Sequence, residues 1–242
     1  MTTIFAPLHQ ITTAEFRRAT EVTYLGCVHG TMAALKRMRA RNRGIIIQVG
    51  SALAYRSIPL QAPYCGAKHA IVGFTDSIRC ELIHENSSVR ITVVHLPAMN
   101  TPQFSWGRTR LPRHPEPVPP IFQPEVAARA IVWASKHARR ELYVGWPTVK
   151  AIYGQTLAPG LGDRFLAASG YESQQTHEPV DPNRPDNLFE PVPGDYAAHG
   201  VFDRQAIRTS PWTWLDMHRG LVGAGVASLA GLALWVTRRA QR

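Results

Sequence analysis

Residues 44–51 read Gly-Ile-Ile-Ile-Gln-Val-Gly-Ser, a short apolar run rich in β-branched side chains. A run of this length and composition is typical of a strand buried on both faces, as in a parallel sheet. Residues 89–96 (Val-Arg-Ile-Thr-Val-Val-His-Leu) form a second such run, which Pro97 stops, and residues 142–146 form a third. The sequence therefore predicts three short buried strands.

Helical patterns separate these runs. Residues 12–15 (Thr-Thr-Ala-Glu) have the form of a capping box, and apolar residues recur at helical spacing from there to Met38. Residues 61–85 and residues 124–137 carry two further helical patterns. Because helices that alternate with buried strands form βαβ units, we expect an α/β fold with a doubly wound parallel sheet.

Three polar residues stand where such a sheet carries its chemistry. Ser51 ends the first strand, and Tyr64 and Lys68 are four residues apart on the next helix, so their side chains share one face. A tyrosine has a pKa of about 10, and a nearby ammonium group lowers it by favouring the phenolate. Tyr64 is therefore predicted to be a general acid/base for an alcohol–carbonyl pair, with Ser51 bonding the substrate oxygen at the carboxyl edge of the sheet.

The residues around this triad resemble a known family. Residues 50–55 (Gly-Ser-Ala-Leu-Ala-Tyr) and 64–68 (Tyr-Cys-Gly-Ala-Lys) are together similar to the short-chain dehydrogenase/reductase family. The resemblance covers residues 1–150 and is strongest over 12–101. It implies an oxidoreductase acting on a small-molecule alcohol or carbonyl substrate, with NAD or NADP carrying the hydride.

The resemblance also implies individual roles. Tyr64 would exchange the proton, Lys68 would also bind the nicotinamide ribose, and Ser51 would position the substrate carbonyl. Residues 97–101 (Pro-Ala-Met-Asn-Thr) resemble the loop that contacts the nicotinamide end, although the family's glycine is an alanine here. Thr23 stands where the family has an asparagine that holds a water of a proton relay. The candidate cofactor contacts are then Tyr64, Lys68, Pro97, Ala98 and Thr101.

Part of the family pattern is absent. No glycine-rich TGxxxGxG turn, which seats the cofactor pyrophosphate on a helix N-terminus, precedes Ser51, and no Asn-Ala-Gly segment does. The expected fold is therefore a partial Rossmann-like sheet, the C-terminal half of the family fold. Cofactor affinity should fall severely, and the outer edge of the strand at 44–50 should be exposed.

Three stretches organise the chain. Residues 1–170 are expected to form the partial Rossmann-like domain, and the proline-rich residues 171–212 an extended strap or linker without regular structure. Residues 213–242 are expected to form an apolar helix. Its uncharged run, 220–236, is at the lower limit for spanning a bilayer and predicts membrane association as an alternative to packing on a core or a partner.

Composition narrows the class of protein. Lys and Arg outnumber Asp and Glu by 27 to 17, a net charge of +10, but no nucleic-acid-binding motif accompanies the basic residues. Cys27, Cys65 and Cys80 form no CxxC pair, which favours a reducing, cytoplasmic location. The ten histidines show no metal-ligand spacing, so no metal site is expected.

Three hypotheses about function follow. The first is an active oxidoreductase whose coding region begins upstream of Met1. The second is a truncated, inactive homologue that acts as a binding or scaffold protein, or is a non-functional remnant. The third is a basic protein that binds a membrane surface or nucleic acid, with the motif a coincidence. By family resemblance, a homodimer would use the helices at 13–41 and 61–85.

Overall fold

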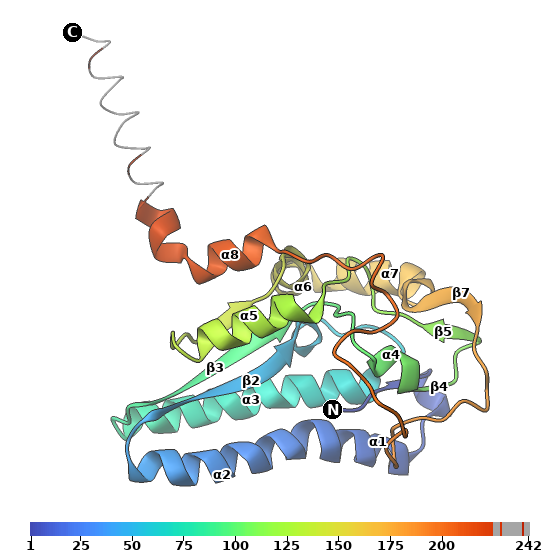
Figure 1. Ribbon diagram of the computed structural model, residues 1–242, viewed down its shortest axis with the longest axis horizontal. Coiled ribbons are helices and arrows are strands. Elements are labelled where there is room, and N and C mark those ends of the chain that lie inside the picture. Colours follow the sequence, from blue (N-terminus) through green and yellow to red (C-terminus); the bar gives the residue numbers. More distant parts are fainter. Residues whose placement is uncertain (225–227, 229–238, 240–242) are drawn as a thin grey trace.

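A three-stranded parallel sheet forms the centre of the protein in the computed structural model, which describes residues 1–224, 228 and 239 (Figure 1). β2 (Gly44–Ser51) pairs with β3 (Val89–Leu96) along its whole length, and β6 (Glu141–Tyr143) pairs with the other side of β3. The predicted α/β class with a parallel sheet is confirmed. Within the residues that the structure describes, β2 pairs on one side only, so its outer edge is open there, as expected.

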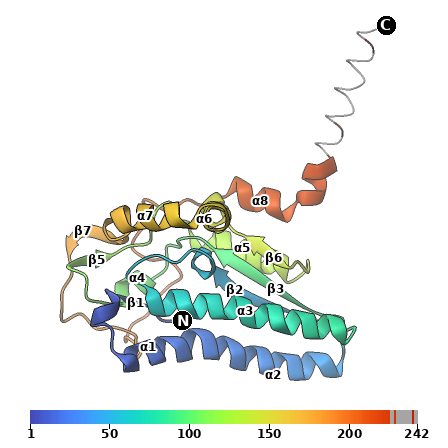
Figure 2. The same cartoon turned by 180° about the vertical axis from the view of Figure 1, so that it is seen from behind.

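Helices cover both faces of this sheet (Figures 1 and 2). On one face, Ile46 and Ile91 pack against Ile78 and Leu82 of α3 (Ala62–His84), with α2 (Gly26–Ala40) beside it. On the other face, Val94 and Leu142 pack against α5 (Pro124–Ala134). The strands are largely apolar because both faces are covered by helices.

The predicted N-terminal helix begins where its capping box places it. The backbone N–H of Thr12 donates to Glu15 Oε2 at 2.8 Å, and the Glu15 N–H donates to Thr12 Oγ1 at 3.3 Å. Helix α1 (Thr13–Thr20) then continues through a π-helical segment, Glu21–Leu25, into α2. A π-helical turn inside a long helix often marks a functional position.

The third strand and the helix after it differ from expectation at their bounds. The sequence predicts a strand over 142–146, but β6 ends at Tyr143 and α6 (Trp146–Leu157) starts three residues later. Gly145 has a φ of 75°, a left-handed conformation that breaks the strand and that glycine adopts without strain. The remaining elements are β1 (Ile4–Phe5), α4 (Gln103–Trp106), β4 (Arg108–Thr109), β5 (Arg113–Pro115), α7 (Pro159–Ser169), β7 (Gln175–Pro179) and α8 (Pro211–Met217).

The proline-rich stretch is not free of regular structure, so that prediction is wrong for one segment. β7 pairs antiparallel with β5, and each strand has its proline at one end, where a missing N–H leaves the short ladder intact. Beyond β7 the chain packs along the domain as an extended strap. Leu188 is fully buried against Ile4 and Ala19, and Arg184 donates to the carbonyl oxygen of Ser105 at 2.7 Å.

The C-terminal end begins with α8, which is attached to the end of β6. Asp216 accepts a hydrogen bond from the Tyr143 N–H at 3.1 Å, and Thr213 Oγ1 accepts one from the Gly145 N–H at 2.9 Å. Most of the apolar run at 220–236, on which the membrane prediction falls, lies outside the described residues. Within the part of the chain that the structure describes, no helix is long and apolar enough to cross a membrane.

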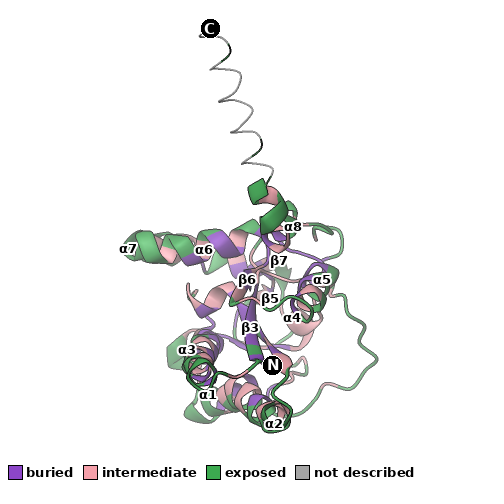
Figure 3. Cartoon of the chain, turned by 90° about the vertical axis from the view of Figure 1, so that its left-hand side faces the viewer, coloured by how far each residue is buried: buried purple, intermediate pink, exposed green. Residues whose placement is uncertain are grey.

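Exposure is uneven over this fold. Figure 3 shows the strands buried at the centre, whereas α7 projects from one side and has no buried residue. The carboxyl ends of β2, β3 and β6 meet at one edge of the sheet. Ser51 ends β2 at this edge, and Pro97, Ala98 and Thr101 lie in the loop that follows β3.

Candidate active site

Ser51 ends β2 and starts the 3₁₀ turn Ala52–Ala54. Its Oγ accepts a hydrogen bond from the Leu53 N–H at 3.1 Å, which turns the chain sharply away from the sheet. The residue is only 6% exposed. The serine hydroxyl is therefore held at the carboxyl edge of the sheet, as the sequence predicts for a group that bonds a substrate oxygen.

Tyr64 lies in the first turn of α3 and is buried. Burial raises its pKa to about 12, against the lowering effect of a hydrogen bond with the Ser51 side chain. Lys68 is one turn further along, with its Nζ 5.6 Å from the centre of the Tyr64 ring. The structure thus brings the three predicted catalytic residues together, but the expected lowering of the Tyr64 pKa is wrong, because desolvation of the phenolate raises that pKa and outweighs the effect of Ser51.

Lys68 is itself only 5% exposed. Burial lowers the pKa of its ammonium group to about 8, although Cys27 acts in the opposite direction. The Nζ donates to the backbone carbonyl oxygen of Val49 at 2.7 Å, on the open edge of β2. The ammonium group of Lys68 therefore donates to a backbone carbonyl of the chain, whereas the family resemblance implies that it binds the ribose of the cofactor.

The loop after β3 is built around a residue that sequence reasoning missed. Asn100 is fully buried, and its amide donates to Gln123 Oε1 at 3.0 Å and to Asp203 Oδ1 at 2.8 Å. This anchors the loop to the start of α5 and to the strap. The candidate cofactor contacts Pro97, Ala98 and Thr101 are partly exposed, and their role stays a prediction.

Thr23 lies in the π-helical segment and is buried. Its Oγ1 accepts a hydrogen bond from the Thr2 N–H at 3.3 Å and donates to the Thr2 carbonyl at 3.1 Å. Both hydrogen bonds join the helix to the N-terminal segment. The hydroxyl that the resemblance assigns to a water relay is thus engaged by the chain itself.

A second polar cluster lies behind Ser51. His95, on β3 and fully buried, places its Nδ1 3.2 Å from the Ser51 carbonyl oxygen and its Nε2 3.4 Å from Glu141 Oε2. The hydroxyls of Tyr55 and Tyr143 each donate to the same Glu141 oxygen at 2.8 Å. A histidine near the carboxyl end of a largely apolar strand was the signal in the sequence that could have marked this cluster.

These contacts set the charge of Glu141. Burial raises the pKa of its carboxyl, but hydrogen bonds from His95, Tyr143 and Tyr55 outweigh burial and hold that pKa at about 2. The pKa values of Tyr55 and Tyr143 are raised, first by burial and then by the adjacent carboxylate. The cluster is therefore an ionised carboxylate surrounded by donors.

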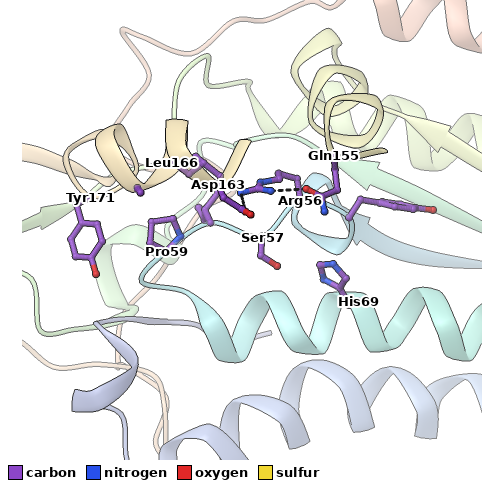
Figure 4. A pocket seen from close by; sticks show the side chains of 11 residues that line it. Arg56, Ser57, Pro59, His69, Gln155, Asp163, Leu166 and Tyr171 are labelled. Carbon is purple, nitrogen blue, oxygen red and sulfur yellow. Dashed lines mark hydrogen bonds and ion pairs between the residues drawn. The ribbon is translucent and has the colours of Figure 1, made fainter. Parts of the chain in front are cut away.

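A pocket of about 510 Å³ opens beside the turn that follows Ser51 (Figure 4). Arg56 spans one wall, donating through Nη2 to Asp163 Oδ1 at 2.7 Å and through Nη1 to Gln155 Oε1 at 2.6 Å. Its lining residues are Tyr55, Arg56, Ser57, Ile58, Pro59, His69, Gln155, Asp163, Leu166, Ala167 and Tyr171. Tyr55 thus belongs both to this pocket and to the Glu141 cluster, whereas Ser51, Tyr64 and Lys68 do not line the pocket.

The described residues offer no grouping of three or more His, Cys, Asp or Glu side chains that could hold a metal ion. Cys27, Cys65 and Cys80 are all free thiols. Cys27 Sγ donates to Gln48 Oε1 at 2.9 Å, which ties α2 to β2. The Cys27 thiol therefore contributes to the contact between α2 and β2.

Comparison with known proteins gives one family. The family model described as short chain dehydrogenase matches residues 2–109. The chain is 30% identical over 241 residues to the uncharacterized oxidoreductase YxnA of Bacillus subtilis, covering 97% of this chain and 65% of that protein. It is 27% identical to dehydrogenase/reductase SDR family member 7B of Mus musculus, covering 66% of this chain and 50% of that protein. The chain thus spans less than two thirds of the length of either relative.

Solved structures agree on the fold. A short-chain dehydrogenase from Burkholderia cenocepacia, in complex with NADP, superimposes with a TM-score of 0.55 at 24% identity over 68% of this chain and 65% of that one. A short-chain dehydrogenase from Streptomyces avermitilis gives a TM-score of 0.53 at 19% identity over 70% of this chain and 67% of that one. At these identities the two structures show likeness of fold alone.

Proposed function

Because this chain belongs to the short-chain dehydrogenase/reductase family, we propose that it is an oxidoreductase that interconverts an alcohol and a carbonyl compound with NAD or NADP. The observation that carries the proposal is that the buried side chains of Ser51 and Tyr64 lie together at the carboxyl end of β2, with Lys68 one helical turn beyond Tyr64. A substrate oxygen that bonds both hydroxyls would be oriented for proton transfer.

In this proposal Tyr64 moves the proton. With a pKa of about 12, its phenol is protonated at neutral pH and can donate to a carbonyl oxygen that gains negative charge. Ser51 supplies a second donor to the same oxygen. The raised pKa therefore suits reduction of a carbonyl compound better than oxidation of an alcohol, which needs Tyr64 as a base.

Lys68 contributes charge. Its ammonium group lies on the same face of α3 as Tyr64, and positive charge near the phenol stabilises the phenolate that remains after proton donation. Since burial brings the pKa of Lys68 to about 8, the group is cationic at neutral pH but loses its proton more readily than an exposed lysine does.

The residues fit one end of a nicotinamide cofactor. Tyr64, Lys68, Pro97, Ala98 and Thr101 would hold the nicotinamide and its ribose, and the cofactor would supply or accept the hydride. Lys68 carries donors that can reach ribose hydroxyls in place of the Val49 carbonyl.

A titration and an assay test the proposal. NADH and NADPH fluorescence should change on adding the full chain, and a panel of aldehydes and ketones should be reduced slowly. Tyr64→Phe should still bind the cofactor measurably through Lys68 and residues 97–101, and it should lose turnover by at least about 100-fold, the contribution of a positioned general acid. Turnover unchanged in Tyr64→Phe would refute the role of this residue.

The alternative, an inactive homologue with a binding role, predicts a different result. Neither cofactor would then change its fluorescence at any protein concentration, and no carbonyl compound would be consumed. These experiments distinguish the two hypotheses, because an active oxidoreductase must both bind the cofactor and show a rate of turnover that depends on Tyr64.

A homodimer through the long helices is a further part of the proposal. Exposed apolar side chains lie on both helices that the family resemblance indicates, with Met32 on α2 61% exposed and Ile83 on α3 70% exposed. Light scattering on the purified chain should give twice the monomer mass. Met32→Glu should shift the protein towards the monomer if this face is used.

A further inference from the structure

His95 has a fixed position behind Ser51. The ring is fully buried at the carboxyl end of β3, with the Tyr55 ring edge-on at 5.1 Å and the Tyr143 ring at 5.6 Å. Across the strands it faces Gly50, where a Cβ atom would lie only 2.7 Å from His95 Nδ1. The absence of a side chain at Gly50 makes room for this imidazole.

Each ring nitrogen faces an oxygen that can only accept a hydrogen bond. Nδ1 lies 3.2 Å from the Ser51 carbonyl oxygen, and Nε2 lies 3.4 Å from Glu141 Oε2. The second contact is within ion-pair distance and longer than an ideal hydrogen bond, and Nε2 has no other partner among the described residues. Backbone carbonyls and ionised carboxylates carry no hydrogen to donate.

A neutral imidazole does not match these surroundings. It has one N–H, so one of its two nitrogens would present a lone pair to an acceptor oxygen in a site without exposure to solvent. An imidazolium presents an N–H to each oxygen and places its charge beside the Glu141 carboxylate. We propose that His95 carries a proton on both ring nitrogens and forms a buried ion pair with Glu141.

The surroundings of Glu141 are consistent with a buried charge pair. Besides His95, the carboxylate receives two hydroxyl hydrogen bonds on Oε2, from Tyr55 and Tyr143, and Arg140 Nε lies 3.6 Å from Oε1. Two hydroxyl hydrogen bonds and two basic side chains at ion-pair distance thus replace water around this group. The arrangement supplies the extra hydrogen bonds that a buried ion pair needs.

The pair acts on the turn that carries Ser51. His95 holds the Ser51 carbonyl, and Glu141 holds the Tyr55 hydroxyl four residues later, so both ends of the turn are tied to β3 and β6. His95 and Glu141 are therefore positioning residues for Ser51. This consequence for catalysis rests on the proposed function, whereas the protonation of His95 does not.

Nitrogen NMR of the full chain with ¹⁵N-labelled histidine tests the protonation at neutral pH. The resonance pair of His95 is the one lost in His95→Gln. Both of its nitrogens should fall in the protonated range, with ring N–H signals that exchange slowly with water. A spectrum with one protonated and one unprotonated nitrogen would overturn the proposal.

Two variants identify the partner. Glu141→Gln removes the negative charge but keeps the size of the side chain, and it should move one His95 nitrogen into the unprotonated range. Tyr143→Phe is the matched control, which removes a donor to Glu141 and keeps its charge, so both His95 nitrogens should stay protonated. His95 nitrogens that remain protonated in a folded Glu141→Gln protein would contradict the pairing.

The NMR readout is independent of turnover. If Glu141→Gln does not fold, the spectrum of the unmodified chain still decides between one and two protonated nitrogens. A chain that shows no oxidoreductase activity but a doubly protonated His95 would refute the proposed function and leave the ion pair standing.

Discussion

The ammonium nitrogen of Lys68 lies 2.7 Å from the backbone carbonyl oxygen of Val49. Val49 is on β2, whose outer edge has no neighbouring strand in the described residues, and an edge carbonyl without a partner costs free energy when it is covered. The ammonium group of the buried Lys68 donates the hydrogen bond that this carbonyl oxygen would otherwise lack. Family resemblance assigns Lys68 to a cofactor ribose. In this chain Lys68 also provides a hydrogen bond to a backbone carbonyl on the open edge of β2.

The titration of Lys68 should appear in the pH dependence of stability. Its pKa is about 8 in the folded chain against an ordinary 10.5, so the unfolded chain binds more protons between these values and stability rises with pH there. Lys68→Met should lack this rise, which amounts to up to about 3 kcal/mol. Urea unfolding at a series of pH values measures it. Lys150→Met, at an exposed lysine of α6, should keep the rise of the unmodified chain.

Tyr64 should act in the opposite direction at higher pH. Its folded pKa of about 12 is above the ordinary value of 10, so its contribution to stability is complete below pH 10 and is lost as the pH rises towards 12. Because the pKa values of Tyr55 and Tyr143 are also raised, absorbance titration should show three tyrosines ionising late. One of these late ionisations should be missing in Tyr64→Phe, and a late absorbance change of unchanged size in that variant would refute the assignment to Tyr64.

Glu15 should make the protein sensitive to acid. Its side chain is 4% exposed and accepts hydrogen bonds from Arg108 at 2.8 Å and Arg110 at 2.6 Å. Burial raises the pKa of Glu15, but hydrogen bonds from Arg110, Thr12 and Arg108 hold it at about 2. The stabilisation is present above pH 4.5 and is lost as the pH falls towards 2.

Replacing Glu15 tests that window. Glu15→Gln should lower the free energy of unfolding at neutral pH by about 3 kcal/mol, because Arg110 and Arg108 lose the carboxylate that they share, although Arg108 keeps its ion pair with Asp186. The difference from the unmodified chain should shrink as the pH falls from 4.5 towards 2, where Glu15 itself becomes neutral. A difference that stays constant with pH would mean that the ion pairs contribute nothing.

Gly50→Ala should disturb the His95 cluster. The added Cβ would lie 2.7 Å from His95 Nδ1 and 2.8 Å from Val93 Cγ1, closer than real contacts, so the imidazole or β3 must shift. Overpacking of this kind costs about 1–3 kcal/mol. Thermal unfolding measures it. Gly66→Ala is the matched control, since nothing lies within 4 Å of its Cβ and alanine in a helix stabilises by about 0.5–1 kcal/mol.

Leu188→Ala should release the strap from the domain. Leu188 is fully buried between the N-terminal segment and α1, and truncation of a buried leucine costs about 2–5 kcal/mol. Limited proteolysis should then cut within residues 180–200 faster than in the unmodified chain. Val201→Ala, at a side chain that is 70% exposed, should leave the cleavage rate unchanged. Equal rates for both variants would show that Leu188 does not anchor the strap.

Local patterns determined much of this protein from its sequence. The capping box at residues 12–15 starts a helix because its hydrogen bonds join residues three apart, and the β-branched run at 44–51 forms a strand because both of its faces are buried. The meeting of Ser51 with Tyr64 was also predictable, since a strand end and the first turn of the next helix lie at the same edge of a parallel sheet.

Only the tertiary structure decided the properties that depend on residues far apart in the chain. The antiparallel pairing of β7 with β5 and the contact of His95 with Glu141 join segments whose separation leaves no periodic signal in the sequence. The proton affinity of Tyr64 was expected to fall because Lys68 is one helical turn away, and it rises because the surrounding chain removes water from the phenol. The spacing of residues along a helix predicts which groups lie near a charged side chain. The solvation of that side chain depends on the whole fold.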